Sequence, residues 1–156
     1  MFVRERVPHL LGSTARQLPD QRELVAAFSG HSGPLDDHPL IGWARALAAL
    51  HRQRRTEPLD AAGIDCRRAE LVATIDDWVA TQLPRRAATE HLRTEPLGAT
   101  VDRMAAAHVH ASHLLHTAEK VSDDRVHAAW YRLALLADEW TDLITGAIQA
   151  KARKTR

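Results

Sequence analysis

The sequence contains little of what secreted or membrane proteins depend on. It has one cysteine, Cys66, in 156 residues, so no internal disulfide can form and the chain suits a reducing compartment. No apolar run approaches the about 20 residues that a membrane-spanning helix needs. The opening residues MFVRERVPHLLG also lack the apolar segment of a signal peptide. We therefore expect a cytoplasmic protein that makes no membrane contact.

Neither sign of charge dominates. The chain carries 21 Lys and Arg against 20 Asp and Glu, for a net charge of +1. Arginines gather locally, but acidic residues are interleaved with them, which is typical of a solvated helical surface rather than of a nucleic-acid interface. We therefore expect no nucleic-acid partner. The local arginines are Arg52, Arg54, Arg55, Arg67, Arg68, Arg85, Arg86 and those of the tail KARKTR.

Strand signals are scarce as well, because β-branched residues are few and never alternate with polar ones over a useful length. Apolar residues instead recur at helical spacing in four long segments, about 37–55, 60–82, 96–118 and 122–150, and in a short one, 20–30. The sequence thus predicts an all-α fold: a four-helix bundle with a short extra N-terminal helix. A circular dichroism spectrum dominated by helix is expected.

Residues 96–150 are predicted to form an antiparallel helical pair, because only Lys120 to Ser122 separate the two apolar patterns. Thr94 and Ser122 are the expected N-caps. The inner stripe of the first helix is expected to comprise Leu97, Val101, Met104, Ala105, His108, Ala111, Ser112, Leu115 and Ala118. That of the second is expected to comprise Val126, Ala129, Trp130, Leu133, Leu136, Ala137, Trp140, Leu143, Ile144, Ala147 and Ile148. Trp43 and Trp78 are also expected to face inward.

The segments are expected to form one domain. Residues 1–19 show no sustained period and are interpreted as an irregular N-terminal arm, 20–150 as the single helical-bundle domain, and 151–156 as a basic C-terminal tail. Asp20 is the expected N-cap of the short helix and Gly30 its end. Asp37 and Pro39 are expected to open the next helix.

The histidines invite a metal interpretation, above all HVHASHLLH at 108–116. On a helix, however, His108 faces the apolar stripe while His110 points to the opposite side, so the cluster does not converge. Cys66 falls on the outward side of its helix without a placed histidine. We therefore predict no catalytic residue, no metal site and no cofactor.

Arg68 lies within the apolar stripe of the third long segment, which otherwise comprises Ile64, Leu71, Val72, Ile75, Trp78 and Val79. Arginines are almost never buried unless paired, so we predict a buried Arg68 bonded to a carboxylate from Asp65, Asp102 or Glu119. Polar residues that could share a pocket between helices define the candidate binding set. This set is His38, His51, Arg68, Asp76, Asp102 and His108.

Several strings occur in a suggestive order: HPL at 38–40, LH at 50–51, ID at 64–65 followed by Arg68, ID at 75–76, and EPLGATVDRM at 95–104. In these strings the chain resembles a bacterial family known only as a domain of unknown function, over about residues 20–150. The resemblance implies a small helical protein and supplies no activity, cofactor or catalytic residue. The segment RQRRTEPLDAAG after His51 is shorter than its counterpart in that family.

Two functions are compatible with the sequence. The leading hypothesis is a non-enzymatic bundle that acts through contacts with a protein partner or as a homo-oligomer, because Leu114, Tyr131 and Leu135 lie off the main stripes. The alternative is an enzyme or small-ligand binder with a pocket between helices near His51, Arg68 and His108.

Overall fold

The computed structural model describes residues 18–82, 96–120 and 123–154, and the side chains of the last helix up to residue 146. Within these ranges the chain is helical and contains no strand, which confirms the all-α fold class. The elements are α2 (Gln21–Phe28), α3 (Pro39–Thr56), the short 3₁₀ helix η1 (Pro58–Asp60), α4 (Ala61–Gln82), α6 (Leu97–Thr117) and α7 (Asp124–Lys154). None of the described helices is long and apolar enough to cross a membrane.

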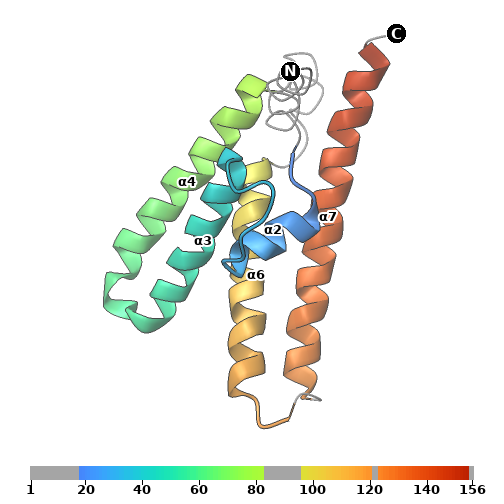
Figure 1. Ribbon diagram of the computed structural model, residues 1–156. Coiled ribbons are helices and arrows are strands. Elements are labelled where there is room, and N and C mark those ends of the chain that lie inside the picture. The colour runs from blue at the N-terminus through green and yellow to red at the C-terminus, as the bar shows by residue number, and fades with distance from the viewer. Residues whose placement is uncertain (1–17, 83–95, 121–122, 155–156) are drawn as a thin grey trace, which may run out of the picture.

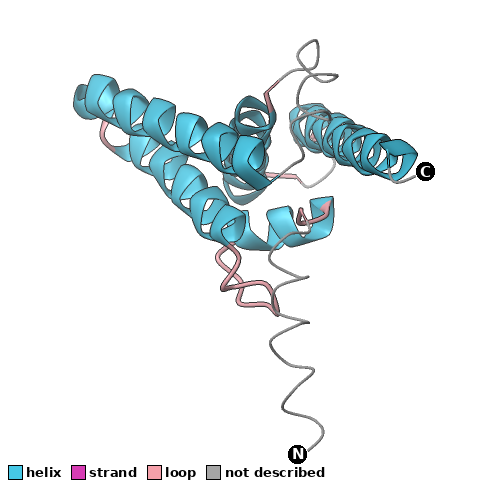
Figure 2. Ribbon diagram, turned by 90° about the horizontal axis from the view of Figure 1, so that it is seen from above, coloured by secondary structure: helices cyan, strands magenta, loops and turns pink. Residues whose placement is uncertain are grey.

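Helix α6 lies at the centre of the bundle and packs against all the other α-helices. On one side α7 runs antiparallel to it, as predicted, and on the other side α3 and α4 form a second antiparallel pair joined through η1 (Figure 1). The short helix α2 crosses α6 on the side of α3 (Figure 2). The opposite face of the molecule is therefore formed by α4, α6 and α7.

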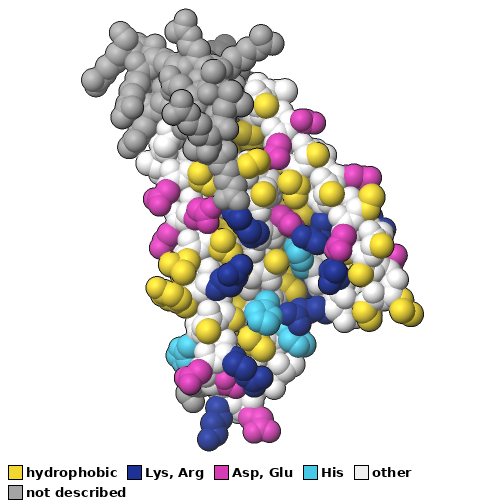
Figure 3. Space-filling model, turned by 180° about the vertical axis from the view of Figure 1, so that it is seen from behind, with side chains coloured by type: hydrophobic (Ala, Val, Ile, Leu, Met, Phe, Trp, Pro, Cys, Tyr) yellow, Lys and Arg dark blue, Asp and Glu magenta, His cyan; other side chains and the backbone are white. Residues whose placement is uncertain are grey.

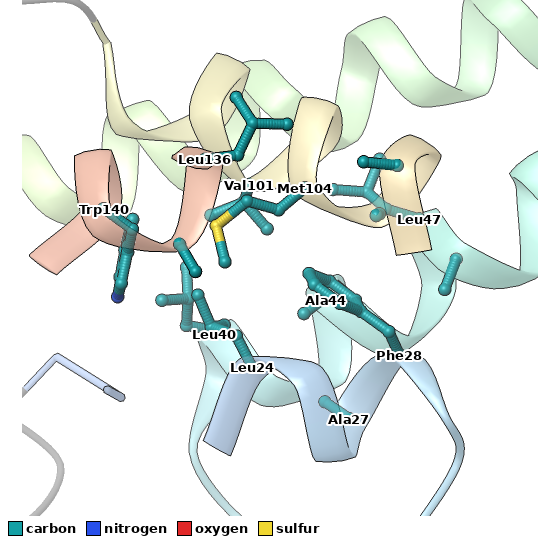
Figure 4. Packing of buried hydrophobic residues seen from close by; sticks show 14 of the residues in the cluster. Leu24, Ala27, Phe28, Leu40, Ala44, Leu47, Val101, Met104, Leu136 and Trp140 are labelled. Atoms are coloured by element: carbon teal, nitrogen blue, oxygen red, sulfur yellow. The ribbon is translucent and has the colours of Figure 1, made fainter. Parts of the chain in front are cut away.

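Helix α2 contributes to the centre of the core rather than to its edge. Its Leu24 and Phe28 are fully buried and lie among Leu40, Leu47 and Met104 (Figure 4). Other helices complete the cluster with Ala44, Ala48, Val101, Ala105, Leu133, Leu136, Ala137 and Trp140. The short helix is thus part of the hydrophobic core, although its apolar residues repeat over only about two helical turns.

The residues that lead into α2 are held in place by a buried contact. Trp140 of α7 is fully buried, and its Nε1 donates a hydrogen bond of 2.9 Å to the carbonyl oxygen of Pro19. The next residue, Asp20, forms a capping box with Glu23, as its predicted N-cap role requires. At the other end Gly30 adopts φ 80°, a left-handed conformation that stops the helix without steric cost.

Some helix boundaries differ from the expected ones. His38, not Asp37, caps α3, because its Nδ1 accepts a hydrogen bond of 3.1 Å from the backbone N–H of Leu40. Helix α7 continues to Lys154, so the backbone of most of the predicted tail is helical. Some predictions concern residues outside the described ranges: those for residues 1–17, for the connection 84–95, for Thr94 and Ser122 as caps, and for the side chains of 147–156.

The predicted stripes are confirmed in α7, where every described member is buried or half-buried. In α6 the prediction for Leu115 is wrong, since this residue is 38% exposed near the end of the helix. Helix α4 is the least covered of the long helices, with only Ile64 and Ile75 buried. The other members of its predicted stripe are half-buried, because α4 packs against α3 and α6 from one side only. They are Arg68, Leu71, Val72, Trp78 and Val79.

Candidate functional site

Polar side chains from three helices meet where α3, α4 and α6 adjoin. On α3, His51, Arg54 and Arg55 follow the spacing i, i+3, i+4, which places them on one helical face. Arg68 of α4 and Asp102 of α6 approach the same face. We refer to the groups joined here, His51, Arg54, Asp65, Arg68 and Asp102, as the charged network.

Asp102 is the centre of the charged network. Its Oδ1 lies 2.8 Å from His51 Nε2, so one hydrogen bond joins α6 to α3. Arg68 donates from Nη2 to Asp102 Oδ2 at 2.7 Å and from Nε to Oδ1 at 3.2 Å, which joins α6 to α4. A bidentate guanidinium–carboxylate pair of this kind fixes both side chains in orientation as well as in position. One carboxylate thus connects three helices.

The electrostatic effect on Asp102 follows from these contacts. Burial by itself disfavours the charged carboxylate, but the hydrogen bonds from His51 and Arg68 outweigh it and lower the pKa of Asp102 from 3.8 to about 2. The carboxylate therefore stays ionised at every physiological pH. Only 15% of its side chain is exposed, so this negative charge is held by its two partners rather than by water.

A second carboxylate extends the charged network toward solvent. Asp65 accepts from Arg68 Nη1 at 2.8 Å and from Arg54 Nε at 2.9 Å. The predicted pairing of Arg68 with Asp65 and Asp102 is therefore confirmed, whereas Glu119 takes no part in it. The prediction that Arg68 is buried is wrong, because 24% of its side chain remains exposed at the thinly covered edge of α4.

A pocket of about 340 Å³ opens beside the network, between α3 and α6. None of its described lining residues is acidic: they are His51, Arg54, Arg55, Ala106 and Val109. On its rim Arg55 Nη2 lies 2.7 Å from Nδ1 of His110. Arg55 pairs with no carboxylate in the described part of the chain. The wall of the pocket is thus basic, and its floor on α6 is apolar.

Arg55 and His110 influence each other's ionisation. Burial, the positive charge of Arg55 and the neighbouring His113 lower the pKa of His110. A neutral His110 can accept the hydrogen bond from Arg55 through Nδ1, whereas a protonated ring cannot. The pair therefore presents one positive charge, together with unused N–H donors of the guanidinium.

The network also orients His51. Since Asp102 holds Nε2, the ring is fixed while Nδ1 has no partner among the described residues and is not enclosed. A histidine held by a carboxylate is suited to donate or accept a proton. No serine, threonine or cysteine is among the described residues that line the pocket, so no nucleophile accompanies it. The arrangement presents guanidinium N–H donors to the pocket and holds an imidazole ring beside them in a fixed orientation.

Two of the predicted binding residues, His38 and Asp76, make contacts at the starts of helices. His38 caps α3 and lies edge-on to Trp78 with ring centroids 5.2 Å apart. Asp76 accepts a hydrogen bond of 2.8 Å from the backbone N–H of Gly98, so it satisfies a donor at the start of α6, one turn before Asp102. Burial raises the pKa of Asp76. Neither residue lines the pocket.

His108 lies on a different face of α6 from Asp102, and it too does not line the pocket. Its ring packs between Phe28 and Trp130, and Nε2 lies 3.2 Å from the hydroxyl of Ser29. Nδ1 is buried without a partner. A serine–histidine pair usually needs a group that orients the other ring nitrogen for nucleophilic catalysis. None is present among the described residues, so we interpret His108 as a core histidine.

Protonation of His108 is expected to destabilise the fold. Burial and the charge of Arg52 lower the pKa of His108, so below about pH 6.5 the unfolded chain takes up a proton that the folded chain resists. Stability that is present above this pH is therefore lost as the pH falls. In urea denaturation between pH 7.5 and 5.5, His108→Leu should lose less stability than the wild type. The exposed His113→Leu should follow the wild type, and parallel profiles for all three proteins would contradict the assignment.

The other histidines of this segment do not converge. His108 is buried and His110 is exposed, as the helical spacing predicts, and His113 and His116 are exposed as well. No group of three or more His, Cys, Asp or Glu residues in the described ranges is placed to hold a metal ion. Cys66 is exposed on α4.

Of the predicted binding residues, the structure brings His51, Arg68 and Asp102 together, whereas the other polar residues of the pocket wall, Arg54 and Arg55, were not in the predicted set. In the sequence Arg54 and Arg55 belong to the local arginines typical of a solvated surface, and His110 is expected to point away from the apolar stripe. A signal was present in the spacing of His51, Arg54 and Arg55, which predicts a shared face. What the spacing could not show is that α6 presents apolar residues opposite that face.

Comparisons with known proteins agree with the resemblance seen in the sequence. The family model described as "Protein of unknown function (DUF4254)" matches residues 47–150. The match includes the whole charged network and the pocket, whereas α2 and the HPL string at 38–40 lie outside it. No curated protein and no solved structure matches the chain.

Proposed function

This chain belongs to the DUF4254 family of proteins of unknown function, and we propose that it binds a small organic anion in the pocket between α3 and α6. The observation that carries the proposal is the basic wall of that pocket. Arg55 and His51 face it, and the two nearby carboxylates are already engaged by Arg68 and Arg54. An incoming anion therefore meets donors without an acidic competitor.

The chemistry of the wall favours a carboxylate or phosphate group. A guanidinium presents several N–H donors in a plane and matches the oxygens of either group. Arg55 uses its Nη2 on His110, and Arg54 uses Nε and Nη2 on Asp65, so other donors of both side chains remain available. His51 adds a ring nitrogen in a fixed orientation. On the face seen in Figure 3, His and Arg or Lys side chains gather near the centre, with Asp and Glu side chains among and around them.

Size and apolar lining restrict the ligand further. A volume of about 340 Å³ lies at the lower end of the range of small-molecule sites. Ala106 and Val109 offer an apolar surface below the charged wall. The pocket therefore suits an anionic group attached to a small apolar moiety better than it suits an inorganic ion.

Binding is expected to depend on Arg55. Phenyl phosphate, benzoate and inorganic phosphate, titrated by isothermal calorimetry, should all bind, and at least one of the two organic anions should bind more tightly than inorganic phosphate. Arg55→Gln should weaken binding by at least about tenfold, because hydrogen bonds to charged groups contribute roughly 1.5–3 kcal/mol.

The matched control is Arg67→Gln, which removes an exposed arginine of α4 whose ionic partner is Asp60 outside the pocket. This variant should bind like the wild type. Equal weakening by both substitutions would indicate non-specific attraction to a basic surface, and no saturable binding of any of the three probes would overturn the proposal.

Association through protein contacts is a second candidate function, and a separate observation supports it. Tyr131 and Leu135, one turn apart on α7, are 66% and 52% exposed. We propose that this side of α7 binds a second copy of the chain. Sedimentation velocity at increasing concentration tests the proposal: Leu135→Glu should remain monomeric where the wild type associates, and a monomeric wild type would reject it.

A further inference from the structure

One polar residue of the pocket between α3 and α6 differs chemically from the other two that line it. Arg54 and Arg55 offer only N–H donors, because a guanidinium group has no acceptor. His51 carries two ring nitrogens, and a neutral ring holds its proton on one of them only. The position of that proton decides whether His51 presents a donor or an acceptor to a ligand.

Asp102 determines where the proton lies. Its Oδ1 lies 2.8 Å from Nε2 of His51, and Arg68 donates two hydrogen bonds to the same carboxylate, at 2.7 and 3.2 Å. These bonds keep the carboxylate ionised, so it can only accept, and the hydrogen bond to Oδ1 must be donated by Nε2. The neutral ring therefore carries its proton on Nε2 and has a lone pair on Nδ1.

The lone pair on Nδ1 is available to a ligand. Nδ1 has no partner among the described residues and is not enclosed. Only 11% of the His51 side chain is exposed, and the residue lines the pocket, so the accessible edge of the ring belongs to the pocket wall. The wall therefore combines guanidinium donors with one acceptor.

The donors and the acceptor are close enough to contact one small ligand. Residues three and four apart on a helix have Cβ atoms about 5–6 Å from each other, and His51, Arg54 and Arg55 have this spacing on α3. A carboxylate bound by the arginines therefore places the substituent of its neighbouring carbon near His51. A hydroxyl group there has a proton that Nδ1 can accept, whereas a plain carboxylate leaves Nδ1 without a partner.

We infer that the pocket takes a 2-hydroxycarboxylate with a small apolar substituent. Arg54 and Arg55 bind the carboxylate, and Nδ1 of His51 accepts a hydrogen bond from the hydroxyl group. Ala106 and Val109 contact the apolar substituent. This inference rests on the proposed anion binding and names the ligand class. A ligand without the hydroxyl group binds less tightly, because it covers Nδ1 without bonding to it.

Mandelate and two analogues test the inference. Phenylacetate lacks the hydroxyl group, and O-methylmandelate carries a methyl group in place of the hydroxyl proton. Both enantiomers of mandelate are titrated by isothermal calorimetry at about pH 8.5, where imidazole rings are ordinarily neutral. The tighter enantiomer should bind about three- to tenfold more tightly than either analogue, which is the contribution of one neutral hydrogen bond.

His51→Leu removes the acceptor, while Asp102 keeps both hydrogen bonds from Arg68. In this variant mandelate should lose its advantage and bind like phenylacetate. Continued binding of phenylacetate shows that the pocket is intact. The matched control is His127→Leu, the same exchange at an exposed histidine of α7 that does not line the pocket, and it should keep the advantage of mandelate.

The outcomes separate this inference from the proposed anion binding. Equal affinity of the wild type for all three compounds would leave the anion site in place and reject a hydroxyl acceptor within it. An advantage of mandelate that persists in His51→Leu would reject His51 as the acceptor. Should His51→Leu not fold, the three compounds on the wild type still decide whether the pocket holds an acceptor. If phenyl phosphate binds and none of the three does, the ligand class is wrong, and no saturable binding of any anion rejects both proposals.

Discussion

Asp102→Ala is expected to lower the free energy of unfolding by about 3 kcal/mol at neutral pH. Removing one member of a buried ion pair leaves its partner in a poor solvent and costs about 3–5 kcal/mol. The lower end applies here, because Arg68 keeps Asp65 as a partner and is partly exposed. His51 loses its only hydrogen-bond partner among the described residues. Urea denaturation of the two proteins measures the difference.

The same comparison has a pH dependence whose sign is fixed by the pKa of Asp102. Because this pKa is about 2 in the folded chain and near 3.8 ordinarily, the unfolded chain takes up the proton first as the pH falls. The stability contributed by Asp102 is present above about pH 4 and is lost as the pH falls through about 2. The difference between the wild type and Asp102→Ala should therefore narrow below pH 4.

A matched carboxylate provides the control. Asp138→Ala removes an exposed Asp that has no ionic partner in the described part of the chain, and its effect on the monomer should stay within about 0.5 kcal/mol. Arg68→Ala should cost less than Asp102→Ala, since Asp102 keeps its bond to His51. If Asp102→Ala and Asp138→Ala had equal effects, the charged network would not contribute to stability.

Gly98→Ala is expected to destabilise the fold by about 2 kcal/mol, although alanine is intrinsically the better helix former by about 1 kcal/mol. A Cβ atom at this position would lie 2.5 Å from the backbone carbonyl oxygen of Val72 and 2.8 Å from Oδ1 of Asp76. A side-chain oxygen can move aside, but the backbone oxygen of α4 cannot. The start of α6 would therefore have to move away from α4.

This displacement should also affect the site. Gly98 lies one turn before Asp102. If α6 moves away from α4 at Gly98, the distance between Asp102 and Arg68 increases. We expect Gly98→Ala to weaken the binding of phenyl phosphate as well as to lower stability. Gly42→Ala in α3 is the control, because its Cβ would meet no atom within 4 Å, and it should be neutral or slightly stabilising. Equal stability of both variants would show that the close approach of α4 and α6 is not required.

Local patterns predicted the helices well, because helical periodicity and capping depend on residues that are near in sequence. The capping box of Asp20 and Glu23 and the termination at Gly30 are of this kind. The antiparallel arrangement of α6 and α7 was also predictable, since a connection of a few residues leaves no other path. The inner face of α7 followed from its broad apolar stripe.

What the sequence by itself determined, then, was the set of helices, the facing of their apolar stripes and the local pairing of Asp65 with Arg68 at i, i+3. The tertiary structure alone decided which polar residues from different helices meet. Asp76 and Asp102 both belong to the predicted candidate set, yet one caps α6 and the other holds Arg68 and His51. That choice depends on the rotation and axial position of α4 and α6 against each other, which are set by contacts such as the approach of Gly98 to Val72 rather than by any local period.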